Sequence, residues 1–159
     1  MNARPHRFAT RLRWSGPERG ATTSYQTYSR DYAIEADGKP PLEGSADPHF
    51  RGDGGRYNPE DLLVASLSAC HLLSYLAECA RAGIAILSYT DDADGEMSVI
   101  EGVMRFRQVT LRPRVEIADA ERIDEAYALH ERAHAACFIA NSVNFPVRHD
   151  AVLSVAAPA

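Results

Sequence analysis

The sequence predicts an α+β protein in which the elements follow the order strands, helix, strands, helix, strand. Apolar and polar residues alternate in the first third of the chain and again between the two helices, which is typical of half-buried strands. Two longer segments, 58–83 and 119–143, carry apolar residues at helical spacing. A length of 159 residues allows one domain with a real core, so we expect a single domain over residues 1–159.

The N-terminal third is predicted to be extended and then irregular. Alternation over 6–14 (HRFATRLRW) and 23–36 (TSYQTYSRDYAIEA) predicts two strands, with a turn at 15–20 between them. Residues 43–57 are rich in Gly, Asp and Arg and are predicted to form a polar loop. Loops of that length in small domains are often functional.

The first helix is the clearest predicted element. Asn58 is a good N-cap, and Pro59 fits the first helical position. Glu60 and Asp61 face the positive end of the helix dipole, and Gly83 is a suitable C-cap. Apolar residues cover nearly the whole circumference, so we expect this helix to be buried on most sides.

The second half is predicted to contain strands around one more helix. Residues 84–97 and 106–117 have the composition of strands, and 147–157 is predicted to be the final strand. The second helix begins with an Asp119 cap and extends over 119–143.

The composition is that of an ordinary globular protein, with 45% hydrophobic and 25% charged residues. A net charge of −5 argues against nucleic-acid binding, which normally needs a basic surface. Three cysteines are too few for a disulfide scaffold, and the basic N-terminus lacks the apolar run of a signal peptide. We therefore expect a cytoplasmic protein whose apolar helix packs in a core and does not cross a membrane.

Cys70 and Cys137 are the candidate reactive residues. A thiol attacks as the thiolate, and a free cysteine with a pKa of about 8.5 needs a positive neighbour to react well at pH 7. Burial raises that pKa, so a reactive Cys70 requires a cation from elsewhere. Cys137 is free to meet Cys70 if the two helices pack face to face. Four arginines in or beside the N-terminal loops can supply the cation: Arg19, Arg30, Arg51 and Arg56.

Glu60 and Cys79 share the first predicted helix with Cys70. Glu60 precedes Cys70 by ten residues, about 15 Å along a helix, which one side chain cannot span. Glu60 can then serve a cysteine only by orienting an arginine or by serving the site of a second subunit, which hints at a dimer with shared sites. Cys79 lies half a turn out of phase with Cys70 and is expected to fill the core.

The segment NPEDLLVASLSACHLL (58–73), the Gly-ended helix and a second cysteine near the end of a later helix resemble the OsmC/Ohr family of thiol peroxidases. The resemblance covers most of the chain. It implies an OsmC-like α+β fold with antiparallel sheets and two central helices, in an intertwined homodimer with sites at the interface. It also implies cysteine-based reduction of organic hydroperoxides without a cofactor or metal. The implied reductant is a small dithiol or a dihydrolipoyl-type protein.

The same resemblance implies a role for each candidate residue. Cys70 is the peroxidatic cysteine, whose thiolate attacks the O–O bond and becomes a sulfenic acid. Cys137 is the resolving cysteine, which condenses with it to a disulfide that an external thiol reduces. Glu60 holds an arginine against the reactive sulfur. Arg19 is the favoured arginine, and Arg51, just ahead of the Asn-Pro-Glu motif, is the alternative.

The chain departs from the well-studied branches of that family. His71 follows Cys70, and FIANS follows Cys137 where the family usually has a Cys-Pro stretch. These departures leave the preferred substrate and the efficiency as a peroxidase open. We expect His71 to hydrogen-bond a backbone group, with tuning of a thiolate as the alternative.

Two rival functions remain open. His130, His134 and Cys137 share one face of a helix, and with Cys70 or His71 opposite they would make a plausible zinc shell. We regard ordinary half-exposed histidines as the simpler interpretation. The other rival is a non-catalytic dimer that has the same fold and binds a small apolar ligand between its helices.

Overall fold

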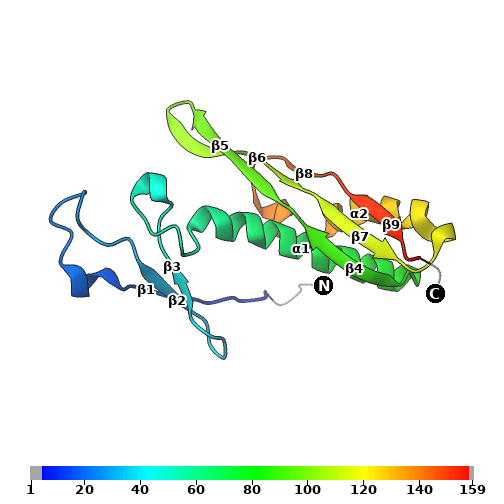
Figure 1. The fold of residues 1–159 in the computed structure, drawn as a ribbon, viewed down its shortest axis with the longest axis horizontal. Coiled ribbons are helices and arrows are strands. Elements are labelled where there is room, and N and C mark those ends of the chain that lie inside the picture. The colour runs from blue at the N-terminus through cyan, green and yellow to red at the C-terminus, as the bar shows by residue number, and fades with distance from the viewer. Residues whose placement is uncertain (1–4, 158–159) are drawn as a thin grey trace. The chain divides into compact units, whose positions relative to one another are not determined.

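The computed structural model describes residues 5–157, which form two compact units. Unit 1 is Met1–Leu62 and unit 2 is Leu63–Ala159. Unit 1 contains one three-stranded sheet, and unit 2 contains two three-stranded sheets and helix α2. Helix α1 begins in unit 1 and continues through unit 2 (Figure 1).

The sheet of unit 1 is antiparallel and consists of β1 (Arg11–Trp14), β2 (Tyr32–Glu35) and β3 (Leu42–Gly44). The strand predicted over 23–36 was too long, because its first half is not extended. The carbonyl of Ser24 accepts the backbone N–H groups of Thr27 and Tyr28, which closes a turn there. The polar loop predicted over 43–57 contains the short 3-10 helix Pro48–Phe50, and its first two residues belong to β3.

Helix α1 (Pro59–Ala82) confirms the predicted start and end. The side chain of Asn58 accepts the N–H of Asp61 at 2.7 Å, and Asp61 accepts the N–H of Asn58 at 3.4 Å. This reciprocal cap satisfies backbone donors that have no partner inside the helix. Gly83 adopts φ = 72°, a left-handed conformation that suits glycine at the end of a helix.

The expectation that α1 is buried on most sides was wrong for the single chain. Its buried residues form one stripe: Leu67, His71, Tyr75, Glu78 and Cys79. Leu73, on another face, is 67% exposed. A single chain has only enough sheet and helix to cover one side of α1, so apolar surface remains open. By length and composition α1 could also cross a membrane, a criterion that core helices of soluble proteins meet as well.

The two sheets of unit 2 are mixed, which corrects the expectation of antiparallel sheets. One has the order β4–β7–β9 and the other β5–β6–β8. Strands β4 and β7, and likewise β5 and β6, pair antiparallel, whereas β9 and β8 add in parallel. The strands are β4 (Ile86–Asp91), β5 (Asp94–Ile100), β6 (Val103–Leu111), β7 (Pro113–Ile117), β8 (Val147–His149) and β9 (Val152–Val155).

Three segments predicted as strands each divide between these sheets, and segment 84–97 does so between β4 and β5. Segment 106–117 divides at Arg112, because Pro113 has no N–H for a continuous ladder. The N–H of Arg112 instead donates to Asp91 at 2.6 Å. Segment 147–157 divides at Asp150, whose N–H donates to the Leu111 carbonyl at 2.9 Å.

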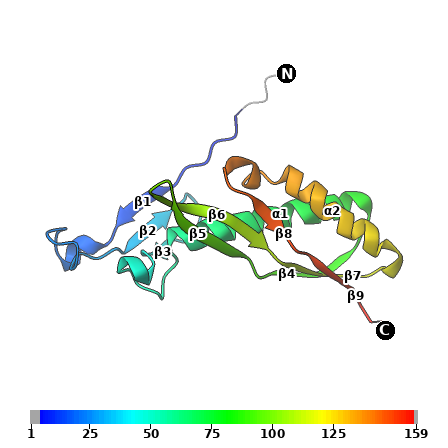
Figure 2. The same cartoon turned by 90° about the horizontal axis from the view of Figure 1, so that it is seen from above.

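Helix α2 (Ile123–Ala136) is shorter than the predicted segment 119–143. Asp119 caps a 3-10 turn before it, and Cys137 follows its last residue with extended backbone angles. Both helices pack on one face of the β4–β7–β9 sheet (Figure 2). The core between them contains residues of α1, β7 and α2: Tyr75, Cys79, Val115, Ile117, Ala126, Leu129 and Ala133.

Candidate active site

A series of polar contacts ties α1 to α2 in antiparallel order within unit 2. Near one end, the Arg122 guanidinium donates to the Ala82 carbonyl at 3.0 Å. Further along, the Tyr75 hydroxyl donates to the Ala126 carbonyl at 3.0 Å, and His71 bonds to His130 at 3.0 Å. The two thiols come next in this series.

Cys70 and Cys137 are neighbours, since Cys70 is among the groups that act on the Cys137 thiol, and both are free thiols. Cys70 is partly exposed, whereas Cys137 is 1% exposed. The backbone N–H of Ala140 donates to the Cys137 sulfur at 3.4 Å. Burial, together with the neighbouring Cys70, raises the pKa of Cys137 to about 11. Cys137 is therefore a thiol at neutral pH, and Cys70 is the accessible sulfur of the two.

Cys70 lines an apolar cavity of about 700 Å³ on unit 2. Leu73 and Ala77 of α1 form one wall, and Ala136 and Phe138 form the other. Phe138 is 81% exposed, so the cavity is open on that side. A small apolar molecule can reach Cys70 here, whereas Cys137 does not line the cavity.

A cluster of stacked rings lies beside the thiols. His71 and His130 are fully buried, and their rings are stacked at 8° with centroids 5.3 Å apart. His130 also stacks on Tyr75 at 3.8 Å, and His149 stacks on His71 at 5.3 Å. Burial, with a smaller effect of neighbouring histidines, lowers the pKa of His71 to about 4 and that of His130 to about 3. Both rings are therefore uncharged at neutral pH, and His71 bonds a side chain, not the backbone group that we expected.

The zinc shell that was the rival interpretation does not form among the described residues. Within 5–157, no three His, Cys, Asp or Glu side chains are arranged to hold a metal ion. His130 turns to His71, and Cys137 lies beyond the end of α2 with φ −71° and ψ 110°. The helix therefore ends one residue before Cys137, so the helical spacing that predicted one shared face does not extend to this cysteine.

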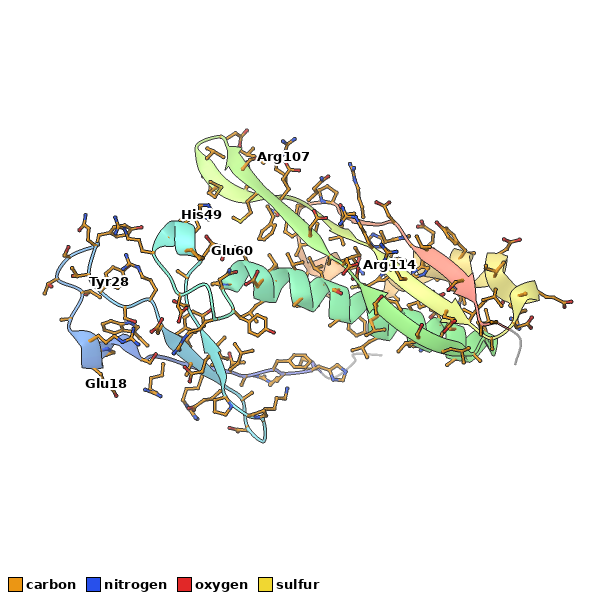
Figure 3. All side chains as sticks on the ribbon, viewed as in Figure 1. Glu18, Tyr28, His49, Glu60, Arg107 and Arg114 are labelled. Atoms are coloured by element: carbon orange, nitrogen blue, oxygen red, sulfur yellow. The ribbon has the colours of Figure 1, made fainter. Side chains whose placement is uncertain are left out.

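Glu60 lines a second apolar cavity, of about 490 Å³, which belongs to unit 1. Figure 3 shows Glu60 in the first turn of α1. Aromatic rings form much of the wall, from Trp14, Tyr28, Tyr32 and Phe50. Glu60 thus lies in unit 1, and Cys70, ten residues later in the same helix, lies in unit 2.

Arg30 is the arginine that lines the cavity of Glu60 among the described residues. Its guanidinium donates to the carbonyl of Tyr28 at 2.5 Å and to that of Tyr25. The guanidinium carbon also lies 3.8 Å from the centroid of the Tyr28 ring and 4.9 Å from that of the Tyr25 ring. These contacts hold the cation in place beside the aromatic wall.

The two arginines favoured from the sequence have other surroundings. Arg19 pairs with Asp31 at 3.2 Å, and the buried Asp31 also accepts the Ser45 hydroxyl at 3.0 Å. Arg51 is exposed and has φ = 65° where it ends the 3-10 helix Pro48–Phe50. Neither lines the cavity of Glu60.

Sequence reasoning listed Arg30 among four candidate arginines without favouring it, and it did not single out two other residues near these cavities and rings, His149 and Phe138. The tyrosines at positions 25 and 28 were a usable signal for Arg30, because aromatic rings near an arginine favour stacking. His149 and Phe138 gave no such signal, since one sits in a short strand and the other follows a helix end.

The OsmC-like protein family model matches residues 52–151. This chain belongs to the OsmC family. An OsmC-like protein of unknown function from Vibrio cholerae has the same fold, with a TM-score of 0.85 and 31% identity over 93% of this chain and 100% of the other. The predicted family and the OsmC-like α+β fold are thereby confirmed.

Two further proteins are less similar to this chain. The organic hydroperoxide resistance protein of Elizabethkingia anophelis has a TM-score of 0.67 and 19% identity over 98% of this chain and 100% of the other, a likeness of fold alone. The uncharacterized protein YmaD of Bacillus subtilis is 26% identical over 95 residues, which are 58% of this chain. That match spans 63% of YmaD, less than two thirds of its length.

Proposed function

We propose that this OsmC-family protein reduces organic hydroperoxides with Cys70 and Cys137. The observation that carries the proposal is the pairing of one accessible thiol with one buried thiol beside an apolar cavity. The cavity suits a hydroperoxide with an apolar substituent. Family relatives named as organic hydroperoxide resistance proteins support the same chemistry.

The proposed reaction has three balanced steps. The Cys70 thiolate attacks one peroxide oxygen, the O–O bond breaks, and the alkoxide takes a proton and leaves as the alcohol. The sulfenic acid on Cys70 then condenses with the Cys137 thiol, which forms the disulfide and releases water. A small dithiol or a dihydrolipoyl-type protein returns two electrons and two protons to restore both thiols.

The shielding of Cys137 fits its proposed role as the resolving residue. A thiol with a raised pKa is a poor nucleophile towards peroxide, so it stays reduced until Cys70 has reacted. Its closeness to Cys70 favours fast condensation with the sulfenic acid, which limits overoxidation.

We propose that an arginine oriented by Glu60 completes the site by favouring the Cys70 thiolate. Arg19 and Arg51 were the candidates from the sequence. Arg30 is now the preferred candidate, because it lines the cavity of Glu60 and its cation is held by two carbonyls and two rings. A shared site between two copies of the chain, in a homodimer, remains part of the proposal.

Turnover of cumene hydroperoxide with a dithiol reductant tests the proposal. Cys70→Ser should lower turnover by roughly a thousandfold or more, because the nucleophile is lost. Cys137→Ser should consume about one peroxide per site and then stall at the sulfenic acid or beyond. Cys79→Ala is the matched control, since Cys79 is buried in the core and should leave turnover unchanged.

Unchanged turnover in Cys70→Ser would rule out the assignment. If the wild type neither consumes hydroperoxide nor loses two thiols per chain, the rival of a non-catalytic protein that binds an apolar ligand is favoured.

A further inference from the structure

The buried pair His71–His130 has no part in the chemistry proposed above, yet it lies beside both thiols. His71 directly follows Cys70 in α1, and His130 lies seven residues before Cys137. Along α1, the His71–His130 hydrogen bond lies between the Tyr75–Ala126 hydrogen bond and the two thiols. The pair is one of the polar contacts that join α1 to α2, with the Tyr75–Ala126 hydrogen bond and the Glu78–Arg132 ion pair at 2.6 Å.

Two buried histidines stabilise a core less than apolar side chains would. Nδ1 of His71 and Nε2 of His130 are buried and have no hydrogen-bond partner among the described residues. A buried polar atom without a hydrogen-bond partner is destabilising, because it has lost its bonds to water. Two apolar side chains of similar size would avoid that cost, so packing alone does not account for two imidazoles here.

The surroundings of the pair favour uncharged rings. One ring must donate and the other accept, so two protonated rings would face each other with two N–H groups. Even one proton would place a charge among stacked rings, at a site from which water is excluded. The groups that face the pair are Tyr75 of α1, Tyr127 and His134 of α2, and His149 of β8. The carboxylates of Glu131 and Asp150 act on His149.

We propose that the His71–His130 pair positions the dithiol site, holding α1 against α2 so that Cys70 and Cys137 meet, and that it does so only while both rings are uncharged. The inference rests on the proposed function for its biological meaning, because apposed thiols matter where Cys137 resolves Cys70. Protonation in acid loosens the contact, and the disulfide then forms less readily.

Thiol–disulfide exchange with dithiothreitol tests this without any hydroperoxide. Oxidised dithiothreitol takes two electrons and two protons from the protein dithiol, leaving reduced dithiothreitol and the protein disulfide. The thiols are the same in the wild type and in the variants below, so a difference between their pH profiles reports on the histidine pair. In the wild type we expect the constant to fall about tenfold between pH 7 and pH 4, as the pair takes up protons.

Three variants separate positioning from packing. His130→Asn places a non-titrating amide atom near the position of Nδ1, so it should keep the wild-type constant at pH 7 and lose the acid dependence. His130→Leu removes the hydrogen bond and should lower the constant about tenfold at pH 7, with a flat profile in acid. His49→Asn, at an exposed position of unit 1, should match the wild type throughout.

The inference would be overturned if folded His130→Leu had the exchange constant of the wild type at pH 7. It would also be overturned if the exchange constant of His130→Asn fell in acid as much as that of the wild type. If His130→Leu does not fold, His130→Asn decides alone. A protein that shows this exchange behaviour but does not reduce hydroperoxide would refute the proposed function and leave the positioning role intact. If the wild type reduces hydroperoxide but its exchange constant does not change between pH 7 and pH 4, the positioning role is refuted and the proposed function stands.

Discussion

At the residue scale, the two sulfurs differ mainly in their access to solvent. Cys70 lines an open cavity, whereas Cys137 is buried and accepts a backbone N–H. In the proposed reaction this difference sets the order of events, because peroxide meets Cys70 first. Arg81, the arginine that lines the cavity of Cys70, pairs with Glu78 at 2.6 Å.

Arg30 is therefore the residue whose substitution should be most informative. In Arg30→Gln we expect Cys70 to react more slowly with alkylating reagents, because a positive charge that favours the thiolate is lost. Alkylation of Cys70 at pH 7 should slow about tenfold, as measured by the pH dependence of iodoacetamide labelling.

Arg19→Gln is the matched control for charge. It removes an exposed partner of Asp31, so we expect it to lower the free energy of unfolding by about 1 kcal/mol without slowing alkylation. If Cys70 alkylation is slower in Arg19→Gln and unchanged in Arg30→Gln, Arg19 is again the preferred cation.

At the element scale, the packing of α1 on α2 makes stability depend on pH. Burial lowers the pKa of His71 to about 4 from the usual 6.5, so the unfolded chain binds a proton at a pH where the folded chain does not. The contribution of this group to stability is complete above pH 6.5 and is lost as the pH falls towards 4. At pH 5 the loss should be about 2 kcal/mol.

Urea unfolding at pH 7 and pH 5 measures this loss. His71→Gln should be less sensitive to acid than the wild type, because one titrating group has been removed. An equal loss in both proteins would mean that His71 is not the group that titrates.

Sequence patterns predicted the elements better than their pairing. The Asn58 cap and the Gly83 end of α1 were predictable because capping depends on local residues. The division of 106–117 and 147–157 between two sheets was not, since it depends on Pro113 and Asp150 meeting partners far away in the chain. For the same reason, the partnership of His71 with His130 could not be read from α1 alone.

At the scale of the whole molecule, the open apolar face of α1 bears on assembly. Leu73 is 67% exposed, and Leu76 is 37% exposed, on a helix whose sequence is apolar nearly all round. The sequence predicted burial that the single chain does not provide. An exposed apolar face of this kind is what the proposed homodimer would cover with a second copy.

We therefore expect light scattering to give a mass near twice the 17.5 kDa of one chain. Leu73→Glu should shift the protein towards the monomer by at least about tenfold in dissociation constant, because it places a charge in an apolar interface. Val103→Glu, an exposed apolar position next to the β5–β6 turn, is the control and should leave the mass unchanged. A monomeric wild type would remove the shared site from the proposal.

The central claim is that Cys70 and Cys137 form one dithiol site, and peptide mapping tests it most directly. The reduced protein is treated with one equivalent of cumene hydroperoxide, quenched in acid and digested without reductant. We predict a single new cross-linked peptide that joins Cys70 to Cys137, with Cys79 still a free thiol. Recovery of Cys70 and Cys137 in separate, unlinked peptides after the peroxide has been consumed would contradict the account.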